Sequence, residues 1–293
     1  MKQVVSISLG SSDQDFEFVT TFLGVKMRVQ RIGTNGSTAE AVKRIKAWDR
    51  KADAIALGVL KDHYKVGSRR FIDRDSAKLK AVATHVPVST GGRLGDIFQE
   101  WAVRHAQIKL GNFFNNARVL FFSGMSDYKL AQAMAEYTPN LQFADPLLQL
   151  GVPKLLDSLD ALNLYATGAH YVKDWTLPQA MASAPVKEWT RYMLRKALQH
   201  ATVVVAPVHE LDDFDLEELA GKTVVTATVN DARVAALRDK GVATIVDGAP
   251  CLHGHVLGAA LLDAMIMAAT DKRNQDLLED DYLEIITGVG QGT

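Results

Sequence analysis

Three things are scarce in this sequence: cysteine, long apolar runs and an excess of charge of one sign. Cys251 is the single cysteine of 293 residues, so an internal disulfide framework and a Cys-x-x-Cys metal site are both excluded, and a reducing, cytoplasmic compartment is expected. Lys plus Arg total 33 against 34 for Asp plus Glu, which leaves no uniform field to attract nucleic acid or a membrane. No apolar stretch reaches the roughly 18 residues of a membrane span, and the first residues lack the apolar core of a signal peptide.

The chain instead alternates β-branched runs with helical segments. Short turns separate them, and this alternation requires crossover connections and a mainly parallel sheet. The pattern restarts after the Asn-rich segment 111–116, and the apolar segment 256–270 is expected to be a buried helix. We therefore predict an α/β protein of two α/β units with a ligand cleft between them. Residues 1–114 would form a substrate-binding domain and residues 115–293 a Rossmann-like nucleotide-binding domain.

The second half contains the layout of a dinucleotide site. A strand over 118–122 leads into a turn with Gly124 and a helix, and the next strand ends at Asp145. In such a site the turn amides bind the pyrophosphate and the acid binds the ribose. Only one glycine of the usual three is present, so an ordinary strand–helix–strand unit with a solvated Asp145 is the alternative. With NAD or NADP as the expected cofactor, the candidate cofactor-binding residues are Ser123, Gly124, Ser126, Asp145, Thr226 and Thr228.

A second turn cluster, residues 33–37, has two glycines at the start of a helix. Its amides could form an anion-binding nest, or the cluster could simply be a tight turn with Ser37 or Thr38 capping the helix. Other polar residues that follow strands are predicted to bind the same small anion. The candidate substrate-binding residues are Ser11, Ser12, Thr34, Asn35, Gly36, Arg69, Arg70 and Arg93.

The basic segment 61–75 follows an apolar strand, which is where parallel-sheet proteins place their ligands. Arg69 and Arg70 would clamp a substrate anion, since the guanidinium fork matches carboxylate and phosphate. On an extended chain these neighbours would point to opposite sides. Lys61, His63 or Tyr64 would transfer the proton. The alternative is a solvated basic loop.

Two further clusters are weaker candidates. His253 and His255 precede an apolar helix, and we expect polar residues there to cap that helix rather than to bind a metal, since no supporting ligand motif is present. No metal site is predicted. A serine nucleophile normally sits in a G-x-S-x-G elbow, which the sequence lacks, so hydrolysis through Ser126 is disfavoured.

Six segments, spread over nearly the whole chain, resemble a bacterial family usually labelled quinate 5-dehydrogenase-like, some members of which carry a serine carboxypeptidase label. These segments are VVSISLGSS, RIGTNGS, GSRRFIDRD, ADPLLQLGVP, GKTVVTATVNDARVAALRDKGV and DDYLEII. The resemblance implies an α/β fold more than it implies a reaction. Quinate and shikimate dehydrogenases carry a catalytic Lys and Asp in N-terminal motifs and a glycine-rich cofactor loop, and neither is recognisable in this sequence.

The functional hypothesis is an NAD(P)-dependent oxidoreductase that acts on a small anionic hydroxy or keto compound. Two alternatives stay open: a non-catalytic small-ligand-binding or sensing protein, and a serine hydrolase that uses Ser126 or a serine of the first turn. The expected partner is a small anionic molecule, with no nucleic acid and no membrane, and a homodimer is the assembly to consider.

Overall fold

The computed structural model describes residues 1–61, 63–172, 184–207, 210–211, 217–272 and 277–290. The chain divides into two compact units. Unit 1 comprises Met1–His63, Ile72–Phe98 and Ala249–Thr293, and unit 2 comprises Tyr64–Phe71 and Gln99–Gly248. Each unit has its own five-stranded sheet, which confirms the expected α/β fold with two α/β units.

The sheet of unit 1 has the order β2-β3-β1-β4-β7, in which only β2 runs antiparallel. Its strands are β1 (Lys2–Ser8), β2 (Phe16–Phe22), β3 (Val25–Gly33), β4 (Ala54–Gly58) and β7 (Val88–Ser89). Ser8 at the end of β1 pairs with Gly33 and Gly58, the last residues of its two neighbours. The loops that follow β1, β3, β4 and β7 therefore leave from one edge, the carboxyl edge of unit 1.

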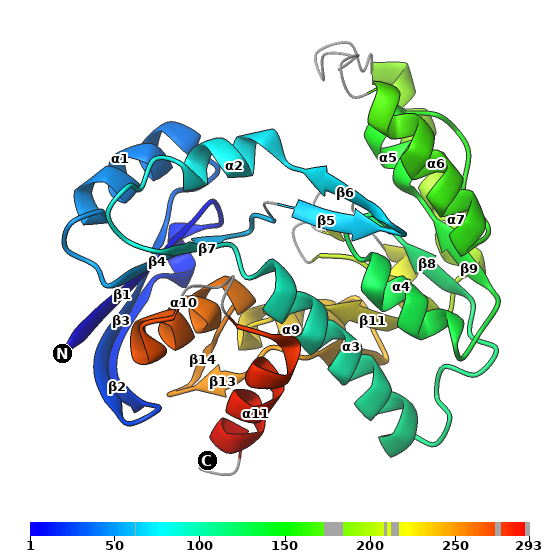
Figure 1. Cartoon of the computed structure of the whole chain (residues 1–293). Coiled ribbons are helices and arrows are strands. Elements are labelled where there is room, and N and C mark those ends of the chain that lie inside the picture. The colour runs from blue at the N-terminus through cyan, green and yellow to red at the C-terminus, as the bar shows by residue number, and fades with distance from the viewer. Residues whose placement is uncertain (62, 173–183, 208–209, 212–216, 273–276, 291–293) are drawn as a thin grey trace. The chain divides into compact units, whose positions relative to one another are not determined.

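Helices cover both faces of this sheet (Figure 1). On one face α1 (Thr38–Trp48) and α2 (Arg74–Lys80) share an apolar cluster with β1 and β4. On the other face α10 (Ala259–Thr270) and α11 (Glu279–Gly290) pack with the start of α3 (Gly92–Lys109). The N-cap of α1 is Ser37, whose hydroxyl accepts from the Glu40 amide.

A buried carboxylate anchors the C-terminal helices to this unit. Asp263 of α10 is fully buried and accepts hydrogen bonds from the hydroxyls of Ser89 at the end of β7 and Tyr282 of α11, the latter at 2.6 Å. Burial raises the pKa of the Tyr282 phenol, and the neighbouring Asp263 charge raises it further. The 256–270 segment is a buried helix as expected, but it belongs to unit 1.

The sheet of unit 2 is parallel throughout, in the order β12-β11-β10-β8-β9. Its strands are β8 (Val119–Phe121), β9 (Leu141–Phe143), β10 (Val203–Val205), β11 (Thr223–Thr226) and β12 (Thr244–Asp247). The order reverses between β8 and β10. In open parallel sheets this switch point, at the carboxyl ends of the strands, is where ligands bind.

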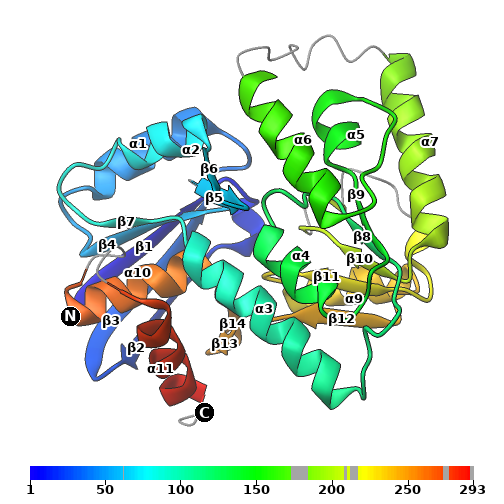
Figure 2. The same cartoon turned by 45° about the vertical axis from the view of Figure 1, so that its right-hand side comes forward.

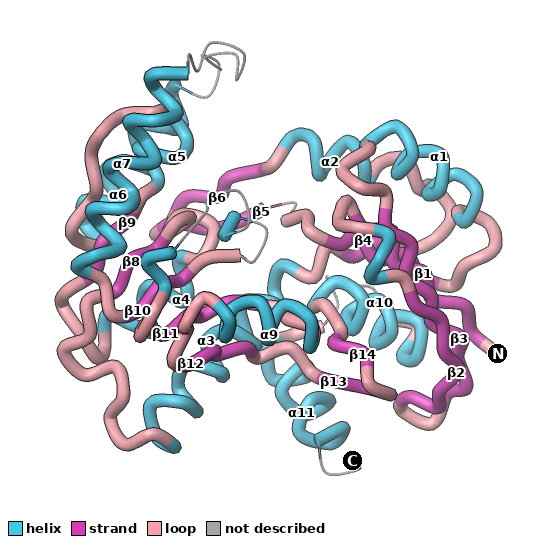
Figure 3. The backbone as a smooth tube through the Cα atoms, turned by 180° about the vertical axis from the view of Figure 1, so that it is seen from behind, coloured by secondary structure: helices cyan, strands magenta, loops and turns pink. Residues whose placement is uncertain are grey.

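Unit 2 is also doubly covered (Figures 2 and 3). One face packs against the second half of α3, α4 (Tyr128–Ala135) and α6 (Leu159–Val172). The other packs against α5 (Asp145–Leu150), α7 (Ala184–His200), α9 (Asp231–Asp239) and the 3-10 helix η3 (Glu217–Leu219). A hairpin of β5 (His63–Val66) and β6 (Arg69–Ile72) joins the first face through Val66 and Phe71.

The structure differs from the sequence-based organisation in several places. The basic segment expected to be irregular forms the β5–β6 hairpin and the start of α2. Helix α3 runs without a break from unit 1 into unit 2, whereas the expected division lay between residues 114 and 115. Helix α5, the hairpin of β13 (Cys251–Leu252) and β14 (His255–Val256), and the short helix η1 (Ser12–Gln14) were not expected.

No helix in the described ranges combines the length and apolar character needed to cross a membrane.

Candidate functional site

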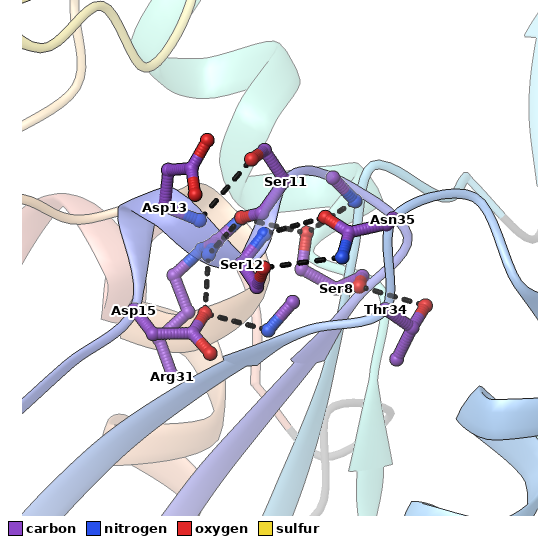
Figure 4. Close-up of polar contacts among 10 residues, drawn as sticks. Ser8, Ser11, Ser12, Asp13, Asp15, Arg31, Thr34 and Asn35 are labelled. Carbon is purple, nitrogen blue, oxygen red and sulfur yellow. Dashed lines mark hydrogen bonds and ion pairs between the residues drawn. The ribbon is translucent and has the colours of Figure 1, made fainter.

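The loops after β1 and β3 interlock at the carboxyl edge of unit 1 (Figure 4). The amides of Thr34, Asn35 and Gly36 donate to the carbonyls of Ser8, Gly10 and Leu9 at 2.8, 3.0 and 2.7 Å. The amides considered as an anion-binding nest are therefore used within the fold, and a ligand at this edge would meet side chains instead.

The side chains that this loop pair offers are the hydroxyls of Ser11 and Ser12 (Figure 4). Ser11 Oγ accepts from the Asp13 amide at 3.1 Å, and Ser12 Oγ accepts from Asn35 Nδ2 at 3.1 Å. Asn35 Oδ1 in turn accepts from the Ser12 amide at 2.8 Å. A hydroxyl that accepts one hydrogen bond keeps its own hydrogen for donation. Both serines are thus fixed in place and able to donate to a carboxylate.

Arg31 supports this loop from beneath (Figure 4). Its side chain is only 12% exposed, and Nη1 donates to the Ser11 carbonyl at 3.0 Å and to Asp15 Oδ1 at 2.9 Å. Nη2 donates to Ser8 Oγ at 3.2 Å. Burial lowers the pKa of the guanidinium, and the Asp15 carboxylate opposes that effect. Arg31 was not predicted from the sequence, in which its only signal is a cation within a strand.

The loop after β4 brings a lysine and a carboxylate together at the same edge. Lys61 Nζ lies 2.7 Å from Asp96 Oδ1, and the two side chains are 25% and 23% exposed. Asp96 belongs to the part of α3 that lies in unit 1. A partly exposed lysine held by a carboxylate can serve as a proton donor, provided a substrate oxygen comes within hydrogen-bond reach.

The backbone between β4 and Lys61 is strained. Val59 has a φ of 65° and is mostly exposed, at 55%. A β-branched residue in the left-handed region is a genuine outlier, and such conformations cluster at functional sites because the surrounding structure must hold them. Gly10 of the first loop lies beside Val59, since a Cβ on Gly10 would come within 3.7 Å of Val59 Cγ2. The loops after β1 and β4 are thus neighbours.

The remaining residues predicted for substrate and proton transfer are distributed between the units. His63 closes the first segment of unit 1, whereas Tyr64, Arg69 and Arg70 lie in unit 2. The Tyr64 ring stacks on Phe71 with centroids 5.3 Å apart. Arg93, in unit 1, donates from Nη1 to the carbonyl of Leu277.

In unit 2 the turn after β8 holds an anion that belongs to the chain itself. The carboxylate of Asp145 accepts from the amides of Gly124 and Met125, each at 2.9 Å, and Asp145 is fully buried. A Cβ on Gly124 would lie 3.0 Å from Phe143 Cε1 and closer still to Cδ1, so packing against Phe143 requires this glycine. The two amides predicted to bind a pyrophosphate therefore already donate to Asp145. The expected contact of Asp145 with a ribose stays a prediction, and it requires Asp145 to give up these two hydrogen bonds.

Burial raises the pKa of Asp145 to about 6, although the two amide donors act in the opposite direction. An unfolded Asp has a pKa of about 3.9. Protonation therefore favours the folded state: this contribution is fully present below about pH 4 and is lost as the pH rises through about 6. We expect the free energy of unfolding of the wild type to fall by about 2 kcal/mol relative to Asp145→Asn between pH 4 and pH 7. Urea unfolding of both proteins at the two pH values measures this, and parallel pH profiles would contradict it.

The other residues predicted for the cofactor lie along the carboxyl edge of unit 2. At the switch point Ser123 Oγ donates to Glu210 Oε1 at 2.9 Å, and Ser126 Oγ donates to the Ser123 carbonyl at 3.0 Å. Thr226 ends β11 with only 3% exposure, and its hydroxyl has no hydrogen-bond partner among the described residues. Thr228 has a φ of 62°. The Thr226 hydroxyl suits a polar ligand group, whereas the turn after β8 does not fit a pyrophosphate as it stands.

The two histidines before α10 pack on β2 within unit 1. His255 stacks on Phe16 with centroids 4.5 Å apart, and His253 Nε2 lies 3.0 Å from Thr20 Oγ1. The N-cap of α10 is Gly258, which offers no side-chain cap, so the expectation that polar side chains cap this helix was wrong. Across the described ranges, no group of three or more His, Cys, Asp or Glu side chains could hold a metal ion.

Among solved structures, the hetero-hexameric glutamate dehydrogenase from Thermus thermophilus, in its Leu-bound form, shows 13% sequence identity and a TM-score of 0.42, covering 98% of this chain and 73% of that chain. At this TM-score the likeness supports no conclusion about function. No curated protein matches the sequence.

Two family models match adjacent parts of the chain. Residues 3–90 match the model described as Domain of unknown function (DUF8753), which covers most of the first two segments of unit 1. Residues 93–291 match the second model, which extends from α3 to α11. Because that match covers more than half of the chain, the protein belongs to the family described as Domain of unknown function (DUF8754).

Proposed function

We propose that this protein is an oxidoreductase that acts on a small anionic hydroxy or keto compound at the carboxyl edge of unit 1. The observation that carries the proposal is the 2.7 Å contact between Lys61 Nζ and Asp96 Oδ1. Both side chains are partly exposed, and Lys61 leaves the sheet at the edge where parallel-sheet proteins bind their ligands.

The chemistry proposed for the pair is proton transfer at the substrate oxygen. In the direction of reduction, Lys61 Nζ donates a proton to the carbonyl oxygen, which becomes the hydroxyl of the product. In the direction of oxidation, the neutral amine takes the proton from the substrate hydroxyl. Asp96 orients the amine and stabilises its charged form. Reactions of this class need a hydride carrier such as NAD or NADP, and in this chain its phosphates need a binding site other than the turn after β8.

The substrate anion is assigned to Ser11 and Ser12. Their hydroxyls are held by bonds from the Asp13 amide and from Asn35 Nδ2, and they keep their hydrogens for a carboxylate. Strands β1 and β4 are adjacent, so the loops with the serines and with Lys61 start side by side. A hydroxy acid bound there would have its carboxylate at the serines and its hydroxyl at Lys61.

One observation favours a second function, a non-catalytic small-ligand-binding protein. The carboxylate of Asp145 fills the turn where a dinucleotide cofactor would place its phosphates. A protein without that cofactor would still bind a small acid in unit 1.

Ligand-dependent stability separates the two functions. A ligand at about 100 times its dissociation constant adds roughly 2.7 kcal/mol to the free energy of unfolding. Thermal unfolding is measured with a panel of small hydroxy and keto acids and with NAD and NADP, for the wild type, Ser11→Ala and the control Ser68→Ala, which removes the hydroxyl of an exposed serine in unit 2. We expect an acid to stabilise the wild type and the control but not Ser11→Ala, and the same acid to be turned over with NAD or NADP. Stabilisation without turnover favours the binding protein, and no stabilisation by any acid contradicts the site.

A further inference from the structure

The β5–β6 hairpin of unit 2 sorts its side chains onto two faces. Val66 and Phe71 are each 2% exposed and pack into the apolar cluster on one face of the sheet. Tyr64 joins them by stacking on Phe71, at 5.3 Å and 8° between the rings. Because side chains alternate along a strand, Lys65 and Arg70 project from the opposite face, and both are exposed.

The register of the hairpin places these two cations opposite one another. The turn consists of Gly67 and Ser68, with Gly67 in the left-handed region at φ 58°. A two-residue turn pairs the residues on either side of it, so Lys65 faces Arg70, in agreement with the Tyr64–Phe71 stack one position further along. Directly opposite residues have Cβ atoms about 4.5–5.5 Å apart, and like charges there destabilise the hairpin.

No carboxylate in the described part of the chain neutralises this pair. Neither Lys65 nor Arg70 has an ion pair or hydrogen bond there. The adjacent Arg69 is also exposed, but by the same alternation it projects from the other face. The nearest downstream acids are engaged elsewhere. Asp73 accepts from the amides of Asp75 and Ser76, each at 2.9 Å, as the cap of α2. Asp75 pairs with Lys78 at 3.0 Å.

We propose that Lys65 and Arg70 form a phosphate-binding site on the outer face of this hairpin. A guanidinium presents a planar fork that matches a phosphate, and the ammonium adds a point charge beside it. The packed Tyr64–Phe71 side of the hairpin holds the backbone in place, so binding has to order only the two side chains. Two like charges directly opposite one another are unfavourable for folding, and such locally unfavourable arrangements are typical of functional sites. The site lies in unit 2 and does not depend on the proposed role of Lys61 and Asp96.

The test uses charge reversal, because stability and binding should change in opposite directions. Lys65→Glu places a carboxylate opposite Arg70, so it should raise the thermal midpoint without ligand and weaken the binding of inorganic phosphate by about 10- to 100-fold. Arg70→Gln should weaken binding to a similar extent. Lys26→Glu is the control: Lys26 is also an exposed strand residue, and its reversal changes the net charge equally. Binding is measured by titration calorimetry on the full chain.

The proposal is overturned if phosphate does not bind the wild type, if Lys26→Glu weakens binding as much as Lys65→Glu, or if Lys65→Glu lowers the thermal midpoint. Two further arms identify the source of the phosphate. A response of the wild type to NADP but not to NAD supports the site and assigns it to a nucleotide phosphate. A response to a sugar phosphate but to neither nucleotide supports it and assigns it to a phosphorylated small molecule.

Discussion

Alanine at position 91 is expected to destabilise unit 1 strongly. A Cβ on Gly91 would lie 2.6 Å from Ala260 Cα and closer to the backbone of Ala259 and Ala260, at the start of α10. Gly91 also has a φ of 67°. Overpacking costs about 1–3 kcal/mol and a left-handed alanine about 1–2 kcal/mol. Because backbone cannot rotate away as a side chain can, we expect the sum to reach about 4–5 kcal/mol, a size that is exceptional for one substitution.

Gly111 provides the matched control. Its φ of 68° is nearly the same, but a Cβ there would meet nothing within 4 Å. Gly111→Ala should therefore lower the free energy of unfolding only by the cost of a left-handed alanine, about 1–2 kcal/mol. Urea unfolding of the wild type and both variants gives the comparison. Equal losses in the two variants would show that α10 does not press against Gly91 as the structure has it.

Loss of the amine at position 61 is expected to lower turnover by about 10²- to 10⁴-fold, the usual contribution of a positioned acid or base. Lys61→Met keeps the length of the side chain and removes only the proton donor. The KM should change much less than kcat, because the substrate anion is assigned to Ser11 and Ser12. The free energy of unfolding should fall little, since ion pairs with this degree of exposure contribute about 0–1 kcal/mol.

Lys26→Met is the control for this substitution, because it removes an exposed lysine from the same unit. Its turnover should equal that of the wild type. Equal turnover in Lys61→Met and Lys26→Met would show that Lys61 takes no part in the reaction.

Much of the fold follows from local pattern. The strand that leads into the Gly124 turn and the helix capped by Ser37 were predicted at nearly their observed positions. The β5–β6 hairpin was not, because three exposed cations interrupt the alternation that Val66 and Phe71 would otherwise display. The sequence also could not assign α10 to one of the two units, because an apolar helix fits against either sheet. The Asp263 contacts that anchor α10 in unit 1 join residues far apart in the chain.

In the candidate site, too, local pattern predicts some residues and not others. Ser11, Ser12 and Lys61 could be predicted because each follows an apolar strand. Asp96 could not, since its contact with Lys61 depends on where α3 begins relative to the loop after β4. Asp145 could be placed at the end of a strand from the sequence, but not the direction of its side chain. A carboxylate that turns inward to its own amides and one that reaches outward to a ribose have the same spacing from Gly124.

The most direct test of the proposed function is a double-mutant cycle of Lys61→Met and Asp96→Asn, measured as kcat/KM on a substrate found in the ligand screen. Residues that act as one unit give non-additive losses. The proposal predicts that each single variant loses most of the activity and that the double variant loses no more than the worse of the two. Losses that multiply in the double variant, or a single variant with full activity, would contradict the assignment of Lys61 and Asp96 as one proton-transfer pair.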